Sequence, residues 1–245
     1  MRIPLFSDVH ANQQALDAVW EDNIKTVHPE VVYCLGDLVG YGPNPNEVVQ
    51  FVRMNNVPTL MGNYDKGVGF DLDDCGCVYQ HPDNIARGKV SLKWALENTR
   101  PPNKTFLREL PMTIHVKYAG KHLIFVHGSP RAINECPFAD RPEATFARIA
   151  SAADCDLLLF GHTHLPYKKQ VGDTLLVNTG SVGKPKDGDP RTGYVVLTLE
   201  TDTTNVEFRR VDYDVAAAPR AVRMSGLPQD FAIQLETGGA RNLPA

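Results

Sequence analysis

The segment 156–164 constrains the fold more than any other part of the chain. It is a continuous apolar run of strand length that ends in Gly161-His162-Thr163-His164. A run of this kind is typical of a strand buried on both faces. Open α/β sheets bind ligands at the carboxyl ends of their strands, where these two histidines stand. Two imidazoles on one short turn can hold a metal ion, and two histidines in a surface loop are the competing interpretation.

Four other apolar runs end in the same way. They are residues 2–7, 31–35, 57–61 and 123–126, and they lead into Asp8-Val9-His10, Gly36-Asp37, Gly62-Asn63-Tyr64-Asp65 and His127-Gly128. Five runs that each end in Asp, Asn or His are hard to explain as five independent accidents. We therefore predict that these polar side chains lie together at one edge of a sheet.

The remaining pattern predicts an α/β fold. Apolar residues at helical spacing over 13–23 and 47–55 alternate with the first three runs, which predicts a βαβ opening with parallel strands. Further helices are expected over 83–98, where Pro101-Pro102 ends the pattern, and over 139–153. Hairpins are expected over 112–126, 167–178 and 193–211, and closing helices over 215–224 and 229–237. Two mixed sheets that face each other are the natural packing.

Length and charge narrow the class of protein. The 245 residues suffice for one large domain, and candidate ligands that run from Asp8 to His164 favour a single domain over 1–245. A net charge of -4 gives no broad basic face for extended nucleic acid, so we expect a small substrate. No apolar stretch reaches the ~20 residues of a membrane span, and we expect a cytoplasmic protein. A homo-oligomer is compatible with this composition.

Residues 66–82 interrupt the regular pattern. This acidic segment directly follows a candidate ligand, so we predict a lid that shapes the substrate site, with a plain surface insertion as the alternative. It contains Cys75-Gly76-Cys77, which lacks the second cysteine pair of a zinc site and is expected to be a pair of reduced thiols.

The candidate ligands favour a site for two metal ions. They are Asp8, His10, Asp37, Asn63, His127, His162 and His164. Carboxylate, imidazole and amide oxygen suit Mn²⁺ best, with Fe or Zn²⁺ as alternatives. Seven ligands are too many for one tetrahedral ion and fit two ions that share a carboxylate. Two such ions can orient a phosphoryl group and activate a water, so the predicted reaction is phosphoester hydrolysis.

The ordered motifs resemble those of the calcineurin-like metallophosphoesterases. That family carries D-x-H, G-D, G-N-H-[DE], H and G-H-x-H in this order, and the match spans roughly the first two thirds of the chain. The resemblance implies a four-layer αββα sandwich of two mixed sheets flanked by helices. It also implies that Asp8, His10, Asp37 and His164 hold one ion, that Asp37, Asn63, His127 and His162 hold the other, and that Asp37 bridges them.

Tyr64 departs from the family pattern. It stands where the family usually has a histidine that touches the scissile phosphate. The candidate catalytic residues are Asp37, Asn63, Tyr64 and His127. A phenol with an ordinary pKa of about 10 is a poorer proton donor at neutral pH than imidazole. We therefore expect activated or cyclic phosphodiesters to be preferred, unless His81 supplies the proton.

Several further residues are candidates for supporting roles. Asn12, Tyr41, Tyr64 and Ser181 are expected to contact the substrate, since each follows or adjoins a strand end. Lys184, Lys186 and Arg191 form a cationic group that either attracts phosphate or is a solvated turn. Asp65 is expected to hold a ligand histidine in its required tautomer.

The sequence thus predicts a dinuclear metal-dependent phosphodiesterase that acts on a small nucleotide-like substrate. A phosphomonoesterase acting on nucleotides or phosphoproteins is the first alternative. A non-catalytic metal-binding regulatory module is the second, although such a module is expected to lose ligands and all seven positions here carry ligand-competent residues.

Overall fold

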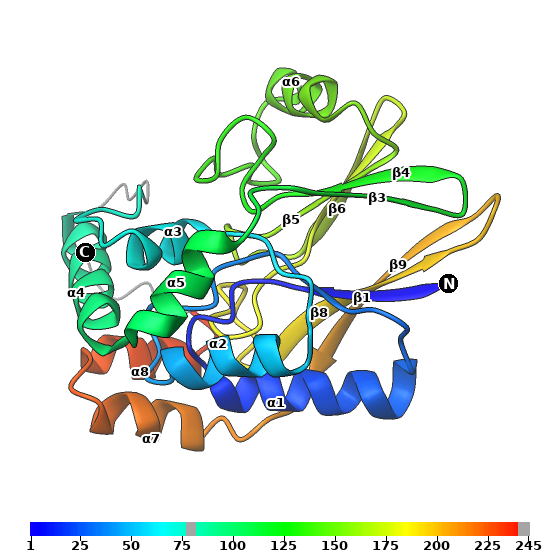
Figure 1. The fold of residues 1–245 in the computed structure, drawn as a ribbon. Coiled ribbons are helices and arrows are strands. Elements are labelled where there is room, and N and C mark those ends of the chain that lie inside the picture. The colour runs from blue at the N-terminus through cyan, green and yellow to red at the C-terminus, as the bar shows by residue number, and fades with distance from the viewer. Residues whose placement is uncertain (77–81, 240–245) are drawn as a thin grey trace.

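A computed structural model describes residues 1–76 and 82–239, and within these residues the chain forms two mixed β-sheets (Figure 1). The first sheet has the strand order β2-β1-β8-β9. Its strands are β1 (Arg2–Phe6), β2 (Tyr33–Cys34), β8 (Thr192–Leu199) and β9 (Thr204–Val211). β1 and β2 are parallel, whereas β8 is antiparallel to both β1 and β9.

The second sheet has the strand order β3-β4-β5-β7-β6. Its strands are β3 (Ile114–Tyr118), β4 (Lys121–Phe125), β5 (Leu157–Phe160), β6 (Tyr167–Val171) and β7 (Thr174–Asn178). The central strands β4, β5 and β7 are parallel, and antiparallel hairpins complete both edges. The continuous apolar run of β5 therefore lies in the middle of its sheet, as its sequence predicts.

Helices cover the outer face of each sheet. On the outer side of the first sheet lie α1 (Gln13–Asp22), which continues into a π-helical turn (Asn23–Val27), and α2 (Pro45–Met54) (Figure 1). α3 (Asn63–Gly69), α4 (Pro82–Asn98) and α5 (Pro101–Glu109) lie beyond the end of its strands, at the left of Figure 1. α6 (Glu143–Ala153) covers the second sheet. α7 (Ala217–Met224) and α8 (Gln229–Glu236) follow the last strand and pack against each other.

Three apolar cores hold these layers together. Side chains such as Leu5, Phe125 and Leu159 fill the space between the sheets. A second core joins the first sheet to its helices, and a third joins Phe146 and Ile149 of α6 to the second sheet. The predicted four-layer αββα sandwich of two mixed sheets is therefore confirmed.

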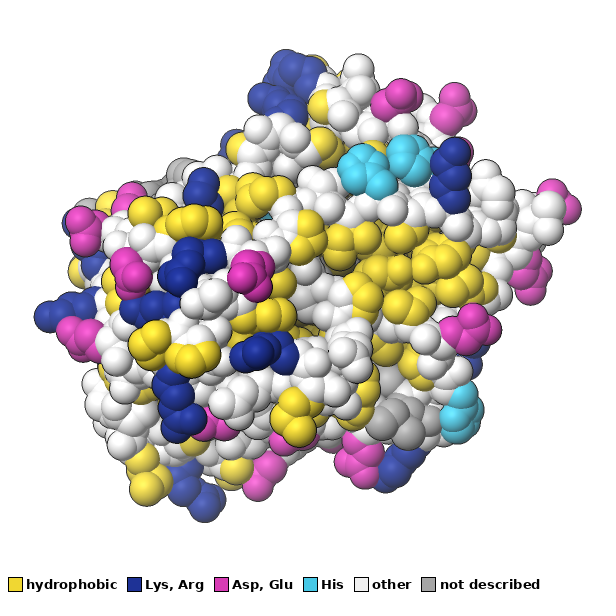
Figure 2. All heavy atoms as spheres, viewed as in Figure 1, with side chains coloured by type: hydrophobic (Ala, Val, Ile, Leu, Met, Phe, Trp, Pro, Cys, Tyr) yellow, Lys and Arg dark blue, Asp and Glu magenta, His cyan; other side chains and the backbone are white. Residues whose placement is uncertain are grey.

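The core between the sheets reaches the surface at one edge. Figure 2 shows hydrophobic side chains gathered there, between the β3–β4 hairpin and the first sheet. Val31, Val116 and Tyr118 are partly exposed and pack against this core.

The helices of the described residues are all too short or too polar to cross a membrane.

The segment 57–61 is not the strand that its apolar residues predict. It forms a single parallel bridge, between Cys34 and Thr59, through the bonds from Cys34 N to Pro58 O and from Leu60 N to Cys34 O. Pro58 has no N–H to extend the ladder. β2, which lies beside this segment, is correspondingly short. Met61 N donates instead to Pro111 O.

Two helices also differ from the prediction. Pro101-Pro102 does not simply end a helix, because α5 begins at Pro101; proline is favoured in the first turn, where its missing N–H costs no hydrogen bond. Residues 63–69 form α3, so the segment predicted to be irregular is helical at its start. His81 and Cys77 lie outside the described residues, and Cys75 is a thiol.

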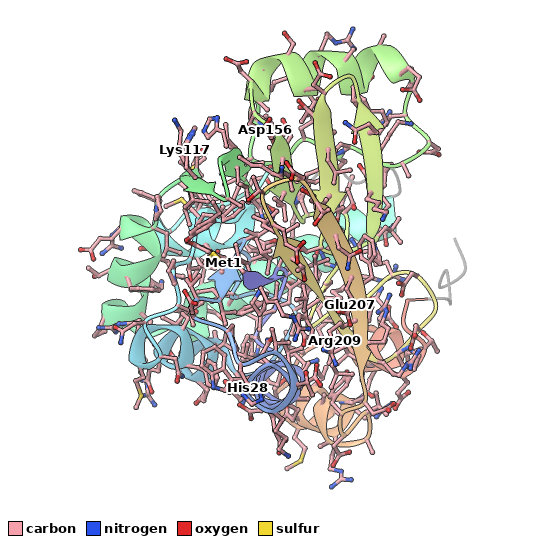
Figure 3. All side chains as sticks on the ribbon, turned by 90° about the vertical axis from the view of Figure 1, so that its right-hand side faces the viewer. Met1, His28, Lys117, Asp156, Glu207 and Arg209 are labelled. Carbon is pink, nitrogen blue, oxygen red and sulfur yellow. The ribbon has the colours of Figure 1, made fainter. Side chains whose placement is uncertain are left out.

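The arrangement brings the strand ends of both sheets together. In Figure 3 the right-hand side of Figure 1 faces the viewer, and Met1 and Asp156, just before β1 and β5, lie on this side. The residues that follow the carboxyl ends of β1, β2, β4 and β5 lie on the far side. Asp8, Asp37, His127 and His162 are therefore neighbours, although more than 150 residues separate the first from the last.

Candidate metal centre

The polar strand ends form two adjacent groups of buried donors. Asp8, His10 and His164 make the first group, and Asp37, His127 and His162 make the second. Within each group, one donor atom from each residue lies within 4.8 Å of the others. The sequence placed all six among the candidate ligands, and the fold brings all six together.

Backbone carbonyls fix the tautomers of three histidines. The Nδ1 atoms of His10, His127 and His164 lie 3.1, 2.8 and 2.6 Å from the carbonyl oxygens of Val39, Leu35 and Lys184. A carbonyl only accepts, so each Nδ1 carries a proton and donates it. Nε2 of each ring is thereby directed into the site, which is how metal-binding histidines are commonly oriented.

The positions of the donor atoms fit a cation. His10 Nε2 and His164 Nε2 face each other at 3.1 Å, and two neutral rings that both donate through Nδ1 would present two lone pairs there. Asp8 Oδ1 and His162 Nε2 are buried and have no hydrogen-bond partner among the described residues. Unsatisfied buried polar atoms cost about 1–3 kcal/mol each, and a bound cation would remove that cost.

Asp37 connects the two groups. Its Oδ2 lies 3.3 Å from His127 Nε2 and 3.7 Å from His10 Nε2, which belong to different groups. Its Oδ1 accepts a hydrogen bond of 2.8 Å from the backbone N–H of Tyr64 and is thereby held away from that position. One oxygen of Asp37 is therefore placed where a ligand shared by two ions would stand.

Asn63 completes the second group. Its Oδ1 lies 3.1 Å from His127 Nε2, and its Nδ2 donates to Cys75 O at 3.2 Å. The carbonyl of Cys75 therefore keeps the amide nitrogen of Asn63 away from the site and its oxygen toward it. The segment after α3 thus contributes a backbone carbonyl that orients Asn63.

Several site residues have left-handed backbone conformations. The φ angles of Asp8, His10, Asp37, His162 and His164 are 55°, 46°, 56°, 65° and 63°. A left-handed conformation costs about 1–2 kcal/mol for a residue with a side chain, so other contacts must stabilise these residues. Bonds from Asp8 N to Gly36 O and from His10 N to Asp37 O, both of 2.9 Å, provide part of that support. Strain of this kind clusters at functional sites.

The turn that carries the two histidines packs directly on Asp8. His162 N donates to Asp8 Oδ2 at 2.9 Å. A Cβ atom at Gly161 would lie 2.5 Å from Asp8 Oδ2 and 2.1 Å from Ser7 Oγ, so only glycine fits there. Asn178 donates to Gly161 O at 2.8 Å and to Thr163 Oγ1 at 2.9 Å, which fixes the turn from the other side.

Asp65 does not orient a ligand histidine as predicted. Its carboxylate instead accepts three backbone N–H groups, those of Asp37, Gly62 and Leu38, at 2.7, 2.9 and 2.9 Å. It ties the strand end that carries Asp37 to the start of α3. Burial and the charge of Asp37 raise the pKa of Asp65 to about 7, although the N–H groups of Gly62 and Leu38 act in the opposite direction.

The residues predicted to bind substrate have different surroundings. Asn12 caps α1 through a bond of 3.1 Å from Ala15 N and donates to Gly183 O. Ser181 Oγ donates to Asp8 O at 2.8 Å. Both are buried and support the backbone of the site. Tyr41 and Tyr64 line the pocket beside it, and each ring lies edge-on to His10.

The open pocket over the two groups has a volume of about 90 Å³. Cys136 and Phe138, from the segment before α6, form part of its wall, and Lys186 lies at its rim. Sequence reasoning missed Cys136 and Phe138, since they belong to no motif and follow no strand. The predicted cationic group is divided: Lys184 packs on the ring of Tyr41, and Arg191 pairs with Asp189 at 2.7 Å.

Burial and neighbouring charges shift the pKa values of the carboxyl and imidazole groups in the site in different directions. Burial alone would raise the pKa of Asp8, but His164 and His10 hold it well below its usual range. Burial would lower the pKa of His127, but the Asp37 carboxylate raises it to about 10. Burial, with the charge on His127, lowers the pKa of His162 to about 4, and burial with Lys186 lowers that of His164 to about 3. At neutral pH His127 is therefore a positively charged imidazolium, whereas His162 and His164 are neutral imidazoles.

Metal binding is therefore expected to release a proton from His127. Because Nε2 must be deprotonated to bind a cation, the affinity for Mn²⁺ should rise by up to about tenfold per pH unit between pH 7 and 9. Calorimetry in buffers with different enthalpies of ionisation measures the proton count. His115→Gln, at an exposed position on β3, should leave it unchanged. Binding at pH 7.5 without proton release would contradict the assignment.

Comparison with known proteins identifies the family. Residues 1–202 match the family model of the calcineurin-like phosphoesterase superfamily domain. The chain belongs to this superfamily, which is metal-dependent. An uncharacterized protein of Methanocaldococcus jannaschii is 33% identical over 254 residues, which cover 96% of this chain and 98% of that protein.

Solved structures have the same fold. A metallophosphoesterase from Sphaerobacter thermophilus is 30% identical with a TM-score of 0.78, and the match covers 97% of this chain and 99% of that one. A hypothetical protein from Pyrococcus horikoshii is 23% identical with a TM-score of 0.84, over 98% and 99% of the two chains. The second likeness concerns the fold alone.

Proposed function

We propose that this chain is a two-metal phosphoesterase that hydrolyses phosphodiester bonds of a small, nucleotide-like substrate. The observation that carries the proposal is the position of Asp37 Oδ2, between a histidine of one donor group and a histidine of the other. Asp8, His10, Asp37 and His164 would hold one ion, and Asp37, Asn63, His127 and His162 the other. Membership in the phosphoesterase superfamily supports the reaction class.

The donor set supports Mn²⁺ as the metal, with Fe or Zn²⁺ as alternatives, because it combines hard carboxylate and amide oxygens with imidazole. When bound, two divalent ions would lower the pKa of a water and offset the negative charge that develops on the phosphoryl oxygens. The protein's own part is to fix the donors: Oδ1 of Asp37 is tied to Tyr64 N, and three imidazoles are tied to carbonyls. Tyr41, Tyr64 and Phe138 line the pocket.

The proton donors of the pocket support a preference for diesters. Among the described residues that line it, every histidine belongs to one of the two donor groups. Tyr64 is 1% exposed and packs against Tyr41, with ring centroids 4.9 Å apart. An imidazole is therefore not left over to protonate a poor leaving group. Substrates whose leaving group departs readily, such as activated or cyclic diesters, should react best.

A paired substrate experiment tests this function. A phosphodiester and a phosphomonoester that share one aryl leaving group are compared, with metal-stripped protein to which Mn²⁺, Fe²⁺, Zn²⁺ or Mg²⁺ is returned. We expect metal-dependent hydrolysis, fastest with Mn²⁺, and a clear preference for the diester. Faster cleavage of the monoester would favour a phosphomonoesterase, and stoichiometric metal binding without turnover would favour a regulatory module.

Replacing Tyr64 tests the role of that position. Tyr64→His introduces an imidazole beside His10 and is expected to raise monoester hydrolysis by about a hundredfold, at the lower end of the usual range for general acid catalysis. Tyr64→Phe keeps the buried ring and should leave diester hydrolysis within a few-fold of the original. Rates are compared at equal metal occupancy. If Tyr64→His does not improve the monoester, the position does not control leaving-group protonation.

A further inference from the structure

One positively charged side chain lies beside the metal pocket. Among the described residues that line this pocket, Lys186 is the only lysine or arginine. It lines the pocket together with His162 and His164, which belong to the two different donor groups. The side chain is exposed at the rim, whereas the donors beneath it are buried. An anion that approaches the donors therefore meets Lys186 on its way.

The segment that carries Lys186 is joined to the metal centre through its backbone. Lys184 O accepts the bond of 2.6 Å from His164 Nδ1, and Lys184 N donates to Ser181 Oγ at 2.8 Å. Ser181 in turn donates to Asp8 O. The position of Lys186 is thus defined relative to His164, two residues beyond a carbonyl that fixes that ring.

The turn after α8 packs against the segment that carries Lys186. Gly188 N donates to Gly238 O at 2.9 Å. Gly238 has a φ of +57°, and a Cβ atom there would lie 2.4 Å from the carbonyl carbon of Asp189. A Cβ atom at Gly239 would lie 2.9 Å from Lys186 Cα. This turn lies outside residues 1–202, the part of the chain that the family model matches.

We propose that Lys186 binds the phosphate group of the substrate, and that the turn at Gly238 and Gly239 positions the segment 185–189 for this contact. The proposal rests on the proposed phosphoesterase function and adds a substrate-binding residue to it. An ammonium group is a compact point charge with three donors, which suits a phosphate oxygen. Tyr41 and Tyr64 also line the pocket, and as neutral phenols they offer no such charge.

Phosphate binding tests the role of Lys186 independently of turnover. Inorganic phosphate is titrated by calorimetry into protein loaded with Mn²⁺. Lys186→Gln should weaken phosphate binding by about tenfold or more, because a charged hydrogen bond is lost, while both metal sites still fill. Arg191→Gln is the matched control, since Arg191 is a cation five residues further along the chain and pairs with Asp189. Unchanged binding in Lys186→Gln, or equal weakening in Arg191→Gln, would overturn the proposal.

A pair of glycine variants tests the positioning role of the turn. Gly238→Ala places a methyl group against the Asp189 backbone and should weaken phosphate binding several-fold. Gly226→Ala is the control: Gly226 also has a positive φ, +83°, but a Cβ atom there would have no heavy atom within 4 Å among the described residues. Both variants carry the backbone strain of a positive φ, and only Gly238→Ala adds a steric clash with the Asp189 backbone. If Gly238→Ala binds phosphate as tightly as Gly226→Ala, the turn does not position Lys186.

The role of Lys186 and the enzymatic function can be refuted independently of each other. If the protein hydrolyses esters and Lys186→Gln binds phosphate normally, the proposed function stands and the role of Lys186 is refuted. If the protein binds phosphate through Lys186 but hydrolyses no ester, the role of Lys186 stands and the enzymatic function is refuted.

Discussion

Replacing Asp37 with asparagine is expected to abolish metal-dependent hydrolysis, with a loss of about a thousandfold or more. Asparagine retains an oxygen that can accept the Tyr64 N–H, but it removes the negative charge between His127 and His10. A site that loses its shared ligand loses several kcal/mol of stabilisation of the transition state, and each 1.36 kcal/mol is worth about tenfold in rate. Steady-state rates and metal stoichiometry are measured on the same preparation.

The control for this variant is Asp173→Asn, in the exposed turn between β6 and β7. It removes the same charge far from the strand ends and should retain full activity and metal content. An Asp37→Asn protein that binds two ions and keeps more than a tenth of the activity would show that Asp37 is not a shared ligand.

Removing the Asp65 carboxylate is expected to destabilise the protein by roughly 4 kcal/mol or more. Asp65→Ala leaves three buried N–H groups without an acceptor, and each such group costs about 1–3 kcal/mol. Asp65→Asn keeps one acceptor oxygen and should lose less. The free energy of unfolding is measured by denaturation in urea.

Asp73→Ala, at an exposed position in the segment after α3, is the matched control and should change stability by less than about 0.5 kcal/mol. If Asp65→Ala gives too little folded protein to measure, Asp65→Asn provides the comparison. A loss below 1 kcal/mol in both Asp65 variants would show that the carboxylate does not hold the strand ends together.

The donor groups could be predicted because strand ends have a distinctive sequence pattern. A buried strand such as β5 must be apolar throughout, so a polar residue directly after it is conspicuous. The fold then brings Asp8, His127 and His162 together because parallel strands end at the same edge of a sheet. The same reasoning predicted both mixed sheets and most helices.

Residues without such a pattern could not be placed. Asp65 resembles a ligand partner in sequence, but its bonds to the backbone N–H groups of Asp37 and Leu38 depend on how α3 packs beside β2. The segment 57–61 is apolar enough for a strand, yet Pro58 prevents a continuous ladder. In both cases, tertiary contacts decide between alternatives that local sequence leaves open.

The walls of the pocket were the least predictable part. Phe138 comes from a segment without regular structure, and Lys186 lies against a turn more than 50 residues further along the chain. Lys184 and Arg191 are close to Lys186 in sequence, but one packs on Tyr41 and the other pairs with Asp189. Composition alone does not distinguish these three cations.

The most direct test of the two-ion centre is a crystal structure of protein loaded with Mn²⁺, with anomalous diffraction data collected above the manganese edge. We predict two anomalous peaks in each chain, one beside Asp8, His10 and His164 and one beside Asn63, His127 and His162, with Asp37 between them. A single peak, or no peak at these residues in protein that is active with Mn²⁺, would contradict the account.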